Sequence, residues 1–166
     1  MVIQGCARRL GDNINTDYII ASRYKTRMAD LASLTPHLFE DADPGLAARI
    51  RPGDLLVAGR NFGGGSSRET AARLILQAGL RAVLALSFSR IFFRNAINVG
   101  LPAIECDTTG MAEDDVLVVD LAAGRIENRT RGRILPFAPL PAVVREILQD
   151  GGLAAHFQRH GGFRIT

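Results

Sequence analysis

A glycine-rich stretch decides the fold: Gly59-Arg60-Asn61-Phe62-Gly63-Gly64-Gly65-Ser66-Ser67-Arg68-Glu69. It follows a short apolar run, residues 55–58, that is typical of a buried strand, and it precedes a helical pattern over residues 71–78. The glycines permit a tight turn because they accept positive φ and carry no side chain. Ser66 lies three residues before Glu69, a spacing that predicts a capping box at the start of the helix. The stretch therefore predicts a strand–turn–helix unit.

Two interpretations of this turn are open from the residues alone. In a capping box the Ser66 hydroxyl faces the backbone N–H groups of Arg68 and Glu69, and such donors favour a bound anion. An ordinary serine-capped turn explains the pattern equally well, because glycine-rich turns between strands and helices are common. The stretch is not a nucleotide loop of either standard kind, since it lacks the Lys-Ser/Thr of a Walker loop and the Rossmann acidic residue. It also lacks the Gly-x-Ser-x-Gly of a nucleophile elbow.

The rest of the chain extends this unit into an α/β fold. Apolar runs at 82–86 and 101–106 predict further strands, with a helix over 88–98 between them, and this alternation implies parallel crossovers. We expect Ile91, Phe92 and Ala96 to lie on the inward face of that helix. Later segments are short and favour an antiparallel meander followed by two helices. We find neither a repeat nor a linker, so we expect one domain over residues 1–166. The other expected elements are a first strand at 2–7, short helices at 29–34 and 44–50, meander strands at 116–121, 125–128 and 132–137, and closing helices at 139–148 and 153–160.

Composition limits the classes of function. The chain has 166 residues, 47% of them hydrophobic, with a net charge of +3. A small basic excess without a basic stripe fits an anionic substrate or an acidic partner, and it does not indicate nucleic-acid binding. Two cysteines, Cys6 and Cys106, suit a reducing cytoplasm and are too few for an iron–sulfur cluster, which needs at least three. The sequence shows no secretory leader and no apolar run long enough to cross a membrane, so we expect a cytoplasmic protein.

Other candidate groups are weaker. His156 and His160 stand four residues apart, a spacing that can bind a metal. We see no third ligand near them in sequence and therefore expect a surface location. The pairs Asp41/Asp43 and Asp114/Asp115 suit loops and helix starts, so hydrolysis by two carboxylates or by a serine–histidine pair has little support.

Four stretches in fixed order resemble a known family, the aconitase swivel domain. The glycine-rich stretch resembles the family signature, and the resemblance spans residues 5–106, with a looser match beyond. In the small subunits of 3-isopropylmalate dehydratase and homoaconitase this domain is a separate chain. The other three stretches are Gly11-Asp12-Asn13-Ile14-Asn15-Thr16-Asp17, Asp41-Ala42-Asp43-Pro44 and Ser87-Phe88-Ser89-Arg90-Ile91-Phe92-Phe93-Arg94-Asn95.

The resemblance implies a fold and an activity. The fold would be a swivelling β/β/α domain, whose mixed sheet has a parallel βαβ core and a short antiparallel meander. The activity would be that of a hydro-lyase small subunit, active only with a large subunit that holds a [4Fe–4S] cluster through its own three cysteines. This chain would bind no cofactor itself and would contact neither nucleic acid nor a membrane. The reaction that the resemblance implies first is the interconversion of 2- and 3-isopropylmalate in leucine biosynthesis. The alternatives are a small subunit of homoaconitase or of another malate-type hydro-lyase, and a non-catalytic, carboxylate-binding regulatory module.

The resemblance also implies roles for individual residues. The serine that matches Ser66 is the catalytic base that removes the proton α to a carboxylate, and Ser67 and Arg68 would bind the substrate carboxylate. Lys25, Thr26 and Arg27 match the loop that selects the substrate side group, and their two cations hint at an extra carboxylate. Arg8 is a further substrate-binding candidate, with a place beside the first strand as the alternative. The chain departs from the family pattern at Gly64 and Thr70, which leaves the substrate open.

Overall fold

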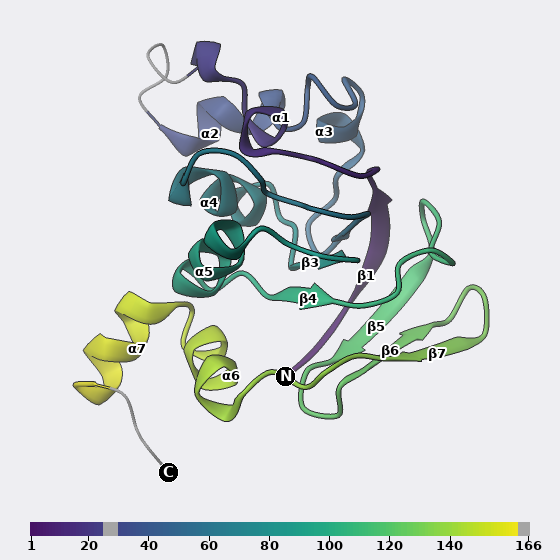
Figure 1. Cartoon of the computed structure of the whole chain (residues 1–166), viewed down its shortest axis with the longest axis vertical. Coiled ribbons are helices and arrows are strands. Elements are labelled where there is room, and N and C mark those ends of the chain that lie inside the picture. Colours follow the sequence, from purple (N-terminus) through teal and green to yellow (C-terminus); the bar gives the residue numbers. More distant parts are fainter. Residues whose placement is uncertain (25–29, 163–166) are drawn as a thin grey trace.

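The computed structural model describes residues 1–24 and 30–162, and in this part of the chain seven strands form one sheet (Figure 1). The sheet has the order β4-β3-β2-β1-β5-β6-β7. The strands are β1 (Val2–Arg9), β2 (Leu55–Ala58), β3 (Ala82–Ala85), β4 (Ala103–Glu105), β5 (Val116–Asp120), β6 (Arg125–Asn128) and β7 (Arg133–Pro136). The helices are α1 (Thr16–Ile19), α2 (Leu31–Leu34), α3 (Leu46–Arg49), α4 (Glu69–Gln77), α5 (Arg90–Val99), α6 (Ala142–Gln149) and α7 (Leu153–His160).

The sheet changes direction at β1. On one side, β1, β2, β3 and β4 pair in parallel, and on the other side β1 pairs antiparallel with β5. The meander β5-β6-β7 continues the antiparallel half. The predicted mixed sheet, with a parallel βαβ core and a short meander, is therefore confirmed.

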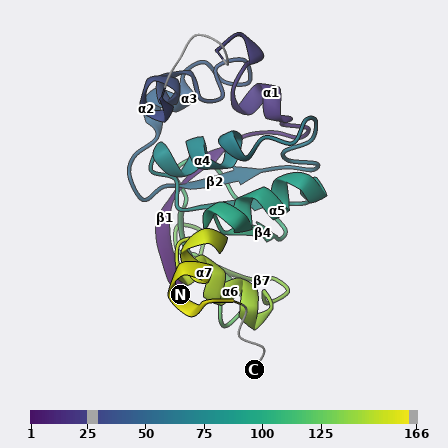
Figure 2. The same ribbon diagram turned by 90° about the vertical axis from the view of Figure 1, so that its left-hand side faces the viewer.

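Strands β2 and β3 are buried on both faces, which explains why they are continuous apolar runs. Along β2 the side chains alternate: Leu56 and Ala58 belong to the core beneath α1–α5, and Leu55 and Val57 belong to a second core. That second core also contains meander residues, such as Leu117 and Ile126, together with residues of α6. The parallel strands therefore lie between the helices α1–α5 on one face and the curled meander with α6 on the other. Figure 2 shows α4 and α5 on one side of the parallel strands, with α6 and α7 nearer the N-terminal end of β1.

Helix α5 follows its sequence signals closely. The Ser89 hydroxyl accepts a hydrogen bond from the N–H of Phe92, and Gly100, at φ +84°, ends the helix in the left-handed conformation. Phe92 and Ala96 face the core as expected. The prediction for Ile91 was wrong, because its side chain is exposed. Its position on α5, one residue before the buried Phe92, turns it away from the sheet.

Within residues 1–24 and 30–162, no helix is both long and apolar enough to span a bilayer.

Candidate active site

The glycine-rich stretch lies against the loop that follows β1. The backbone N–H of Gly63 donates to the carbonyl of Ile14 over 2.6 Å, and the N–H of Thr16 donates to the carbonyl of Gly64 over 2.8 Å. Arg60 N–H donates to Oδ1 of Asp12 over 2.7 Å. Two of the four recognised motifs, whose contacting residues are 48 or 49 positions apart in sequence, therefore form one double loop at the carboxyl ends of β1 and β2.

Two glycines in this double loop allow its close packing. A Cβ on Gly59 would lie 1.8 Å from Oδ1 of Asp12, and a Cβ on Gly63 would lie 2.2 Å from Cγ of Phe92. Gly63 also has φ +79°. A larger residue at position 59 would push the two motif loops apart, and one at position 63 would push the glycine-rich stretch away from α5.

The third motif, at the start of α5, completes the support. The Ser87 hydroxyl accepts from the N–H of Asn61 over 2.8 Å, and the Ser89 hydroxyl donates to the carbonyl of Gly63 over 2.7 Å. Asn95 Nδ2 donates to Oγ of Ser67 over 3.4 Å. The motif around residues 87–95 thus positions the backbone of the glycine-rich stretch and one of its two serines.

The predicted capping box at Ser66 was wrong. Helix α4 begins at Glu69, its N-cap is Arg68 in an extended conformation, and no side chain caps it. Gly65, at φ +96°, turns the chain before Ser66, so this serine leaves the path of the helix and is exposed. Its carbonyl accepts a hydrogen bond from the buried Thr16 hydroxyl over 3.2 Å. Ser66 is therefore held by its backbone while its hydroxyl faces outward.

Arg68 connects this serine to the loop after β1. Its Nη2 lies 2.8 Å from Oδ1 of Asp17 and donates to Oγ of Ser66 over 3.4 Å. Its Nη1 donates to the carbonyl of Ile20 over 3.3 Å, and its side chain is 11% exposed. Asp17 is itself held by the Ser22 hydroxyl over 2.7 Å. These contacts fix the guanidinium beside Oγ of Ser66, the only hydroxyl that it contacts within the described residues. A cation fixed at this place favours negative charge on that hydroxyl.

Sequence reasoning missed the role of Asp17. It lies at the end of the Gly11–Asp17 motif, which was recognised as a whole without a role for Asp17. The sequence did offer a signal for this ion pair. A carboxylate ends one recognised motif, and an arginine lies in another.

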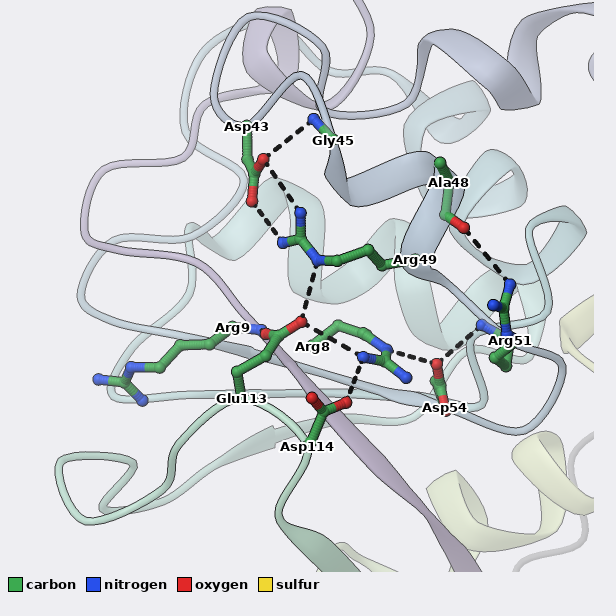
Figure 3. A network of polar contacts seen from close by, with 10 residues as sticks. All are labelled: Arg8, Arg9, Asp43, Gly45, Ala48, Arg49, Arg51, Asp54, Glu113 and Asp114. Atoms are coloured by element: carbon green, nitrogen blue, oxygen red, sulfur yellow. Dashed lines mark hydrogen bonds and ion pairs between the residues drawn. The ribbon is translucent and has the colours of Figure 1, made fainter.

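The Nε and Nη1 donors of Arg8 are engaged in a network of ion pairs (Figure 3). Its Nε lies 2.6 Å from Oδ2 of Asp54, and its Nη1 lies 2.5 Å from Oδ1 of Asp114 and 3.3 Å from Oε1 of Glu113. These carboxylates raise the pKa of Arg8 above its usual value although burial opposes the charge. Arg8 belongs to β1 itself and is 9% exposed at its side chain. These contacts favour the structural alternative, and the substrate-binding role of Arg8 stays a prediction.

The Asp41-Ala42-Asp43-Pro44 motif holds neighbouring arginines. Asp41 makes two hydrogen bonds to the guanidinium of Arg23, at 2.7 and 2.8 Å, and Asp43 pairs with Arg49 at 2.6 Å. Arg23 lies in a 3₁₀ turn at Ser22–Tyr24, directly before the predicted selectivity loop. Lys25, Thr26 and Arg27 themselves lie outside the described residues, so their roles stay predictions.

The two cysteines do not suit a metal cluster. Burial, together with the nearby Asp107 carboxylate, raises the pKa of the Cys106 thiol to about 12. The thiolate is the form that ligates iron, and this shift makes the thiolate of Cys106 less accessible. Cys6 lies on β1, and the sequence contains no third cysteine that could complete a cluster.

The histidine pair near the C-terminal end differs from expectation. His156 is fully buried, so the predicted surface location was wrong for it, and His160 is partly exposed. The missed third group is Asp150, which contacts both rings. Asp150 precedes His156 by only six residues. The turn between α6 and α7 brings their side chains together, and the spacing of possible ligands in the sequence does not reveal that turn.

Comparison with known proteins identifies the chain. The family model of the aconitase C-terminal domain matches residues 13–109, more than half of the chain. The chain belongs to the aconitase C-terminal domain family. This confirms the resemblance carried by the four motifs.

Relatives of this family cover nearly the whole chain. A 3-isopropylmalate dehydratase small subunit 2 from Archaeoglobus fulgidus is 46% identical over 99% of this chain and 100% of its own length. A methanogen homoaconitase small subunit from Methanothermobacter thermautotrophicus is 46% identical over 94% of this chain and 91% of its own. The crystal structure of a 3-isopropylmalate dehydratase from Methanocaldococcus jannaschii is 38% identical, has a TM-score of 0.91, and covers 97% of this chain and 96% of its own.

One departure from the family pattern is sterically mild. A Cβ on Gly64 would meet nothing closer than 3.6 Å, the Oδ1 of Asn61, and Gly64 does not have a positive φ. The double loop of this family member therefore has room for a side chain at position 64. Thr70 is exposed in the first turn of α4 and does not touch the described contacts of Ser66 or Arg68.

Proposed function

We propose that this chain is the small subunit of a 3-isopropylmalate dehydratase, which interconverts 2- and 3-isopropylmalate in leucine biosynthesis. The proposal rests on full-length similarity to dehydratase small subunits from several organisms. A small subunit implies a large one, and the exposed Ser66 beside a fixed arginine is the feature expected of half of a shared active site. The active site would lie between the two chains.

Ser66 would act as the base in the elimination of water. Its hydroxyl is exposed, its backbone is fixed by Thr16, and its one described side-chain contact is with Nη2 of Arg68. This geometry carries the proposal, because a base must reach the substrate C–H while its own position stays fixed. A serine hydroxyl is a weak base unless its anion is stabilised, and the guanidinium 3.4 Å away supplies a stabilising charge.

Arg68 and Ser67 would bind a substrate carboxylate. A guanidinium presents donors in a planar fork that matches a carboxylate. In the isolated chain Asp17 occupies one donor of Arg68, so Asp17 keeps the fork oriented and its charge balanced. The Ser67 hydroxyl, accepting from Asn95, is left with a proton to donate to the substrate.

The iron–sulfur cluster would come from the large subunit. The cysteine count of this chain supports this assignment, because two thiols are fewer than the three that a cluster needs. In the partner chain the cluster would supply a Lewis acid that draws off the substrate hydroxyl. This chain would contribute the base, the carboxylate donors and the loop that selects the side group.

A homoaconitase activity is the second candidate. The methanogen homoaconitase small subunit is as similar in identity as the dehydratase relative from Archaeoglobus. Lys25 and Arg27 fit an additional substrate carboxylate through charge. A direct comparison of substrates separates the two.

The test is a substrate panel with the reconstituted complex. This chain is co-purified with its large subunit, the cluster is rebuilt anaerobically, and turnover is measured for 3-isopropylmalate and for a homoaconitate-type tricarboxylate. We expect turnover of isopropylmalate by the complex and none by this chain alone. Preference for the tricarboxylate would establish the homoaconitase alternative, and a loaded complex that turns over neither would favour a regulatory module.

A further inference from the structure

Three metal-ligating side chains converge at the turn between α6 and α7, far in sequence from the double loop. Oδ2 of Asp150 lies 2.8 Å from Nδ1 of His156 and 2.9 Å from Nε2 of His160. All three donor atoms lie within 4.8 Å of one another. Ligand atoms around a tetrahedral zinc ion, each about 2.0–2.1 Å from the metal, are roughly 3.3 Å apart. The two distances from Asp150 to the histidine nitrogens are slightly shorter than this spacing, so a metal ion requires only small movements of the side chains.

The turn that creates this convergence is rigid. Asp150 is the C-cap of α6, and Gly151 and Gly152 follow at φ +88° and +115°. The N–H of Gly152 donates to the carbonyl of Ile147 over 2.9 Å, which closes the helix end. A Cβ on Gly152 would lie 2.5 Å from the carbonyl oxygen of Asn98, so the turn is packed against the end of α5. The geometry of the three ligands is thus set by the fold and not by mobile side chains.

The side chains on α7 are spaced to present two nitrogens to one point. His156 and His160 lie one helical turn apart on the same face, and their ring centroids are 4.7 Å apart. His156 is buried and presents Nδ1, whereas the partly exposed His160 presents Nε2. Two imidazoles with one carboxylate form a set that suits zinc and related first-row ions better than calcium or magnesium.

An open pocket reaches the cluster from solvent. It has a volume of about 250 Å³ and is lined by Asp150, His160, Glu146, Gln149 and Arg159. Glu146 precedes Asp150 by one turn of α6, so it brings a second carboxylate to the same pocket. Catalytic and accessible metal sites have three protein ligands and an open fourth position, and this pocket supplies the entry path and the open side.

Arg159 is the feature that opposes a cation. It pairs with Oδ1 of Asp150, but it is exposed and leaves Oδ2, the oxygen that faces both histidines, for a metal. In the absence of a metal, the two imidazole N–H groups donate to that same oxygen, so the cluster is also a satisfied hydrogen-bond fork. A metal ion replaces the two shared protons, and the Asp150 carboxylate must move away from the two rings to admit it.

We propose that Asp150, His156 and His160 bind a divalent first-row transition ion of the zinc class, which clamps α7 to the end of α6. The site is separate from Ser66 and Arg68, and it does not depend on the function of the complex. Its role is to fix the last two helices against α5.

Zinc titration of the isolated full-length chain, without any histidine tag, tests the site. Isothermal calorimetry with Zn²⁺ should give one ion per chain, and X-ray absorption of the zinc complex should show imidazole scattering with nitrogen or oxygen ligands at about 2.0–2.1 Å. The variant His160→Gln keeps a side-chain N–H that can reach Asp150 but lacks an imidazole. We expect it to weaken zinc binding by more than about tenfold.

The matched control is His37→Gln. His37 also pairs with a carboxylate, Oε2 of Glu40 at 2.9 Å, but it lies outside the cluster. We expect this variant to bind zinc as the original chain does. Thermal unfolding without zinc checks that both variants are folded, and Asp150→Asn provides a second ligand variant. Absence of stoichiometric zinc binding, or equal binding by the His160 and His37 variants, would overturn the proposal and leave a hydrogen-bond fork.

Discussion

Removal of the Arg8 side chain separates its two possible roles. In the structure Arg8 neutralises Asp54, whose side chain is 6% exposed, and it also contacts Asp114 and Glu113 (Figure 3). In Arg8→Ala the Asp54 carboxylate stays buried without its cation. Removal of one member of a buried ion pair costs about 3–5 kcal/mol. The backbone N–H of Arg51 still donates to Asp54 over 2.8 Å, so we expect a value near the lower limit.

The assay is thermal and urea unfolding of the isolated chain. For a protein of this size, a loss of about 3 kcal/mol lowers the melting temperature by roughly 6–12 °C. The matched control is Arg49→Ala, which removes another arginine of the same network. The Arg49 side chain is 43% exposed, and its pairs with Asp43 and Glu113 are expected to contribute about 1 kcal/mol or less.

Equal stability of the Arg8→Ala and Arg49→Ala variants would contradict a structural role for Arg8. If Arg8→Ala also raised KM in the reconstituted complex without a loss of stability, Arg8 would be a substrate ligand, as the family resemblance suggests. A large loss of stability with unchanged KM would establish it as a structural arginine of β1.

Three further changes test other parts of the structure. Asp17→Asn should raise KM about tenfold by releasing the Arg68 fork, while stability measured by urea unfolding changes little, because the Asp17 side chain is 56% exposed; unchanged KM would show that the pair does not position Arg68. Burial acts to raise the pKa of Asp115, but hydrogen bonds from a backbone N–H and two side chains outweigh it and lower that pKa. The folded pKa is thus below the unfolded one, so the ionised group stabilises the fold above about pH 4 and loses this effect as the pH falls further. Asp115→Asn should therefore flatten the acid limb of stability measured from pH 7 to 3, and an unchanged slope would contradict the shift. Gly63→Ala should destabilise the double loop by more than about 2 kcal/mol in the same unfolding assay, and Gly64→Ala, which has room for its methyl group, should not; similar values would mean that the loop is not tightly packed.

Much of the fold could be predicted because its signals are local. Continuous apolar runs fixed the positions of β2 and β3, and Ser89 and Gly100 marked the two ends of α5. The capping box at Ser66 was wrong because a positive-φ residue, Gly65, redirects the chain before the helix begins. The sequence pattern could not reveal that conformation, since glycine accepts either sign of φ.

The family motif supplied the residues of the candidate site, but only some of the contacts of these residues could be predicted from the sequence. Ser66, Ser67 and Arg68 followed from the family motif, and the structure places them at one double loop. The partner of Arg68, Asp17, required tertiary structure, because 51 residues separate the two in sequence. His156 was misplaced on the surface for the same reason: the turn that brings Asp150 to it depends on two glycines packed against α5.

The measurement that tests the central claim most directly is the turnover of Ser66→Ala in the reconstituted complex. Because Ser66 is exposed and caps no helix, the variant should unfold within about 0.5 kcal/mol of the original chain and should bind the large subunit equally well. Loss of the base should lower kcat about 10²–10⁴-fold, with Thr70→Ala, an exposed change nearby on α4, as the control that retains activity. A kcat close to that of the unaltered complex would show that Ser66 is not the base.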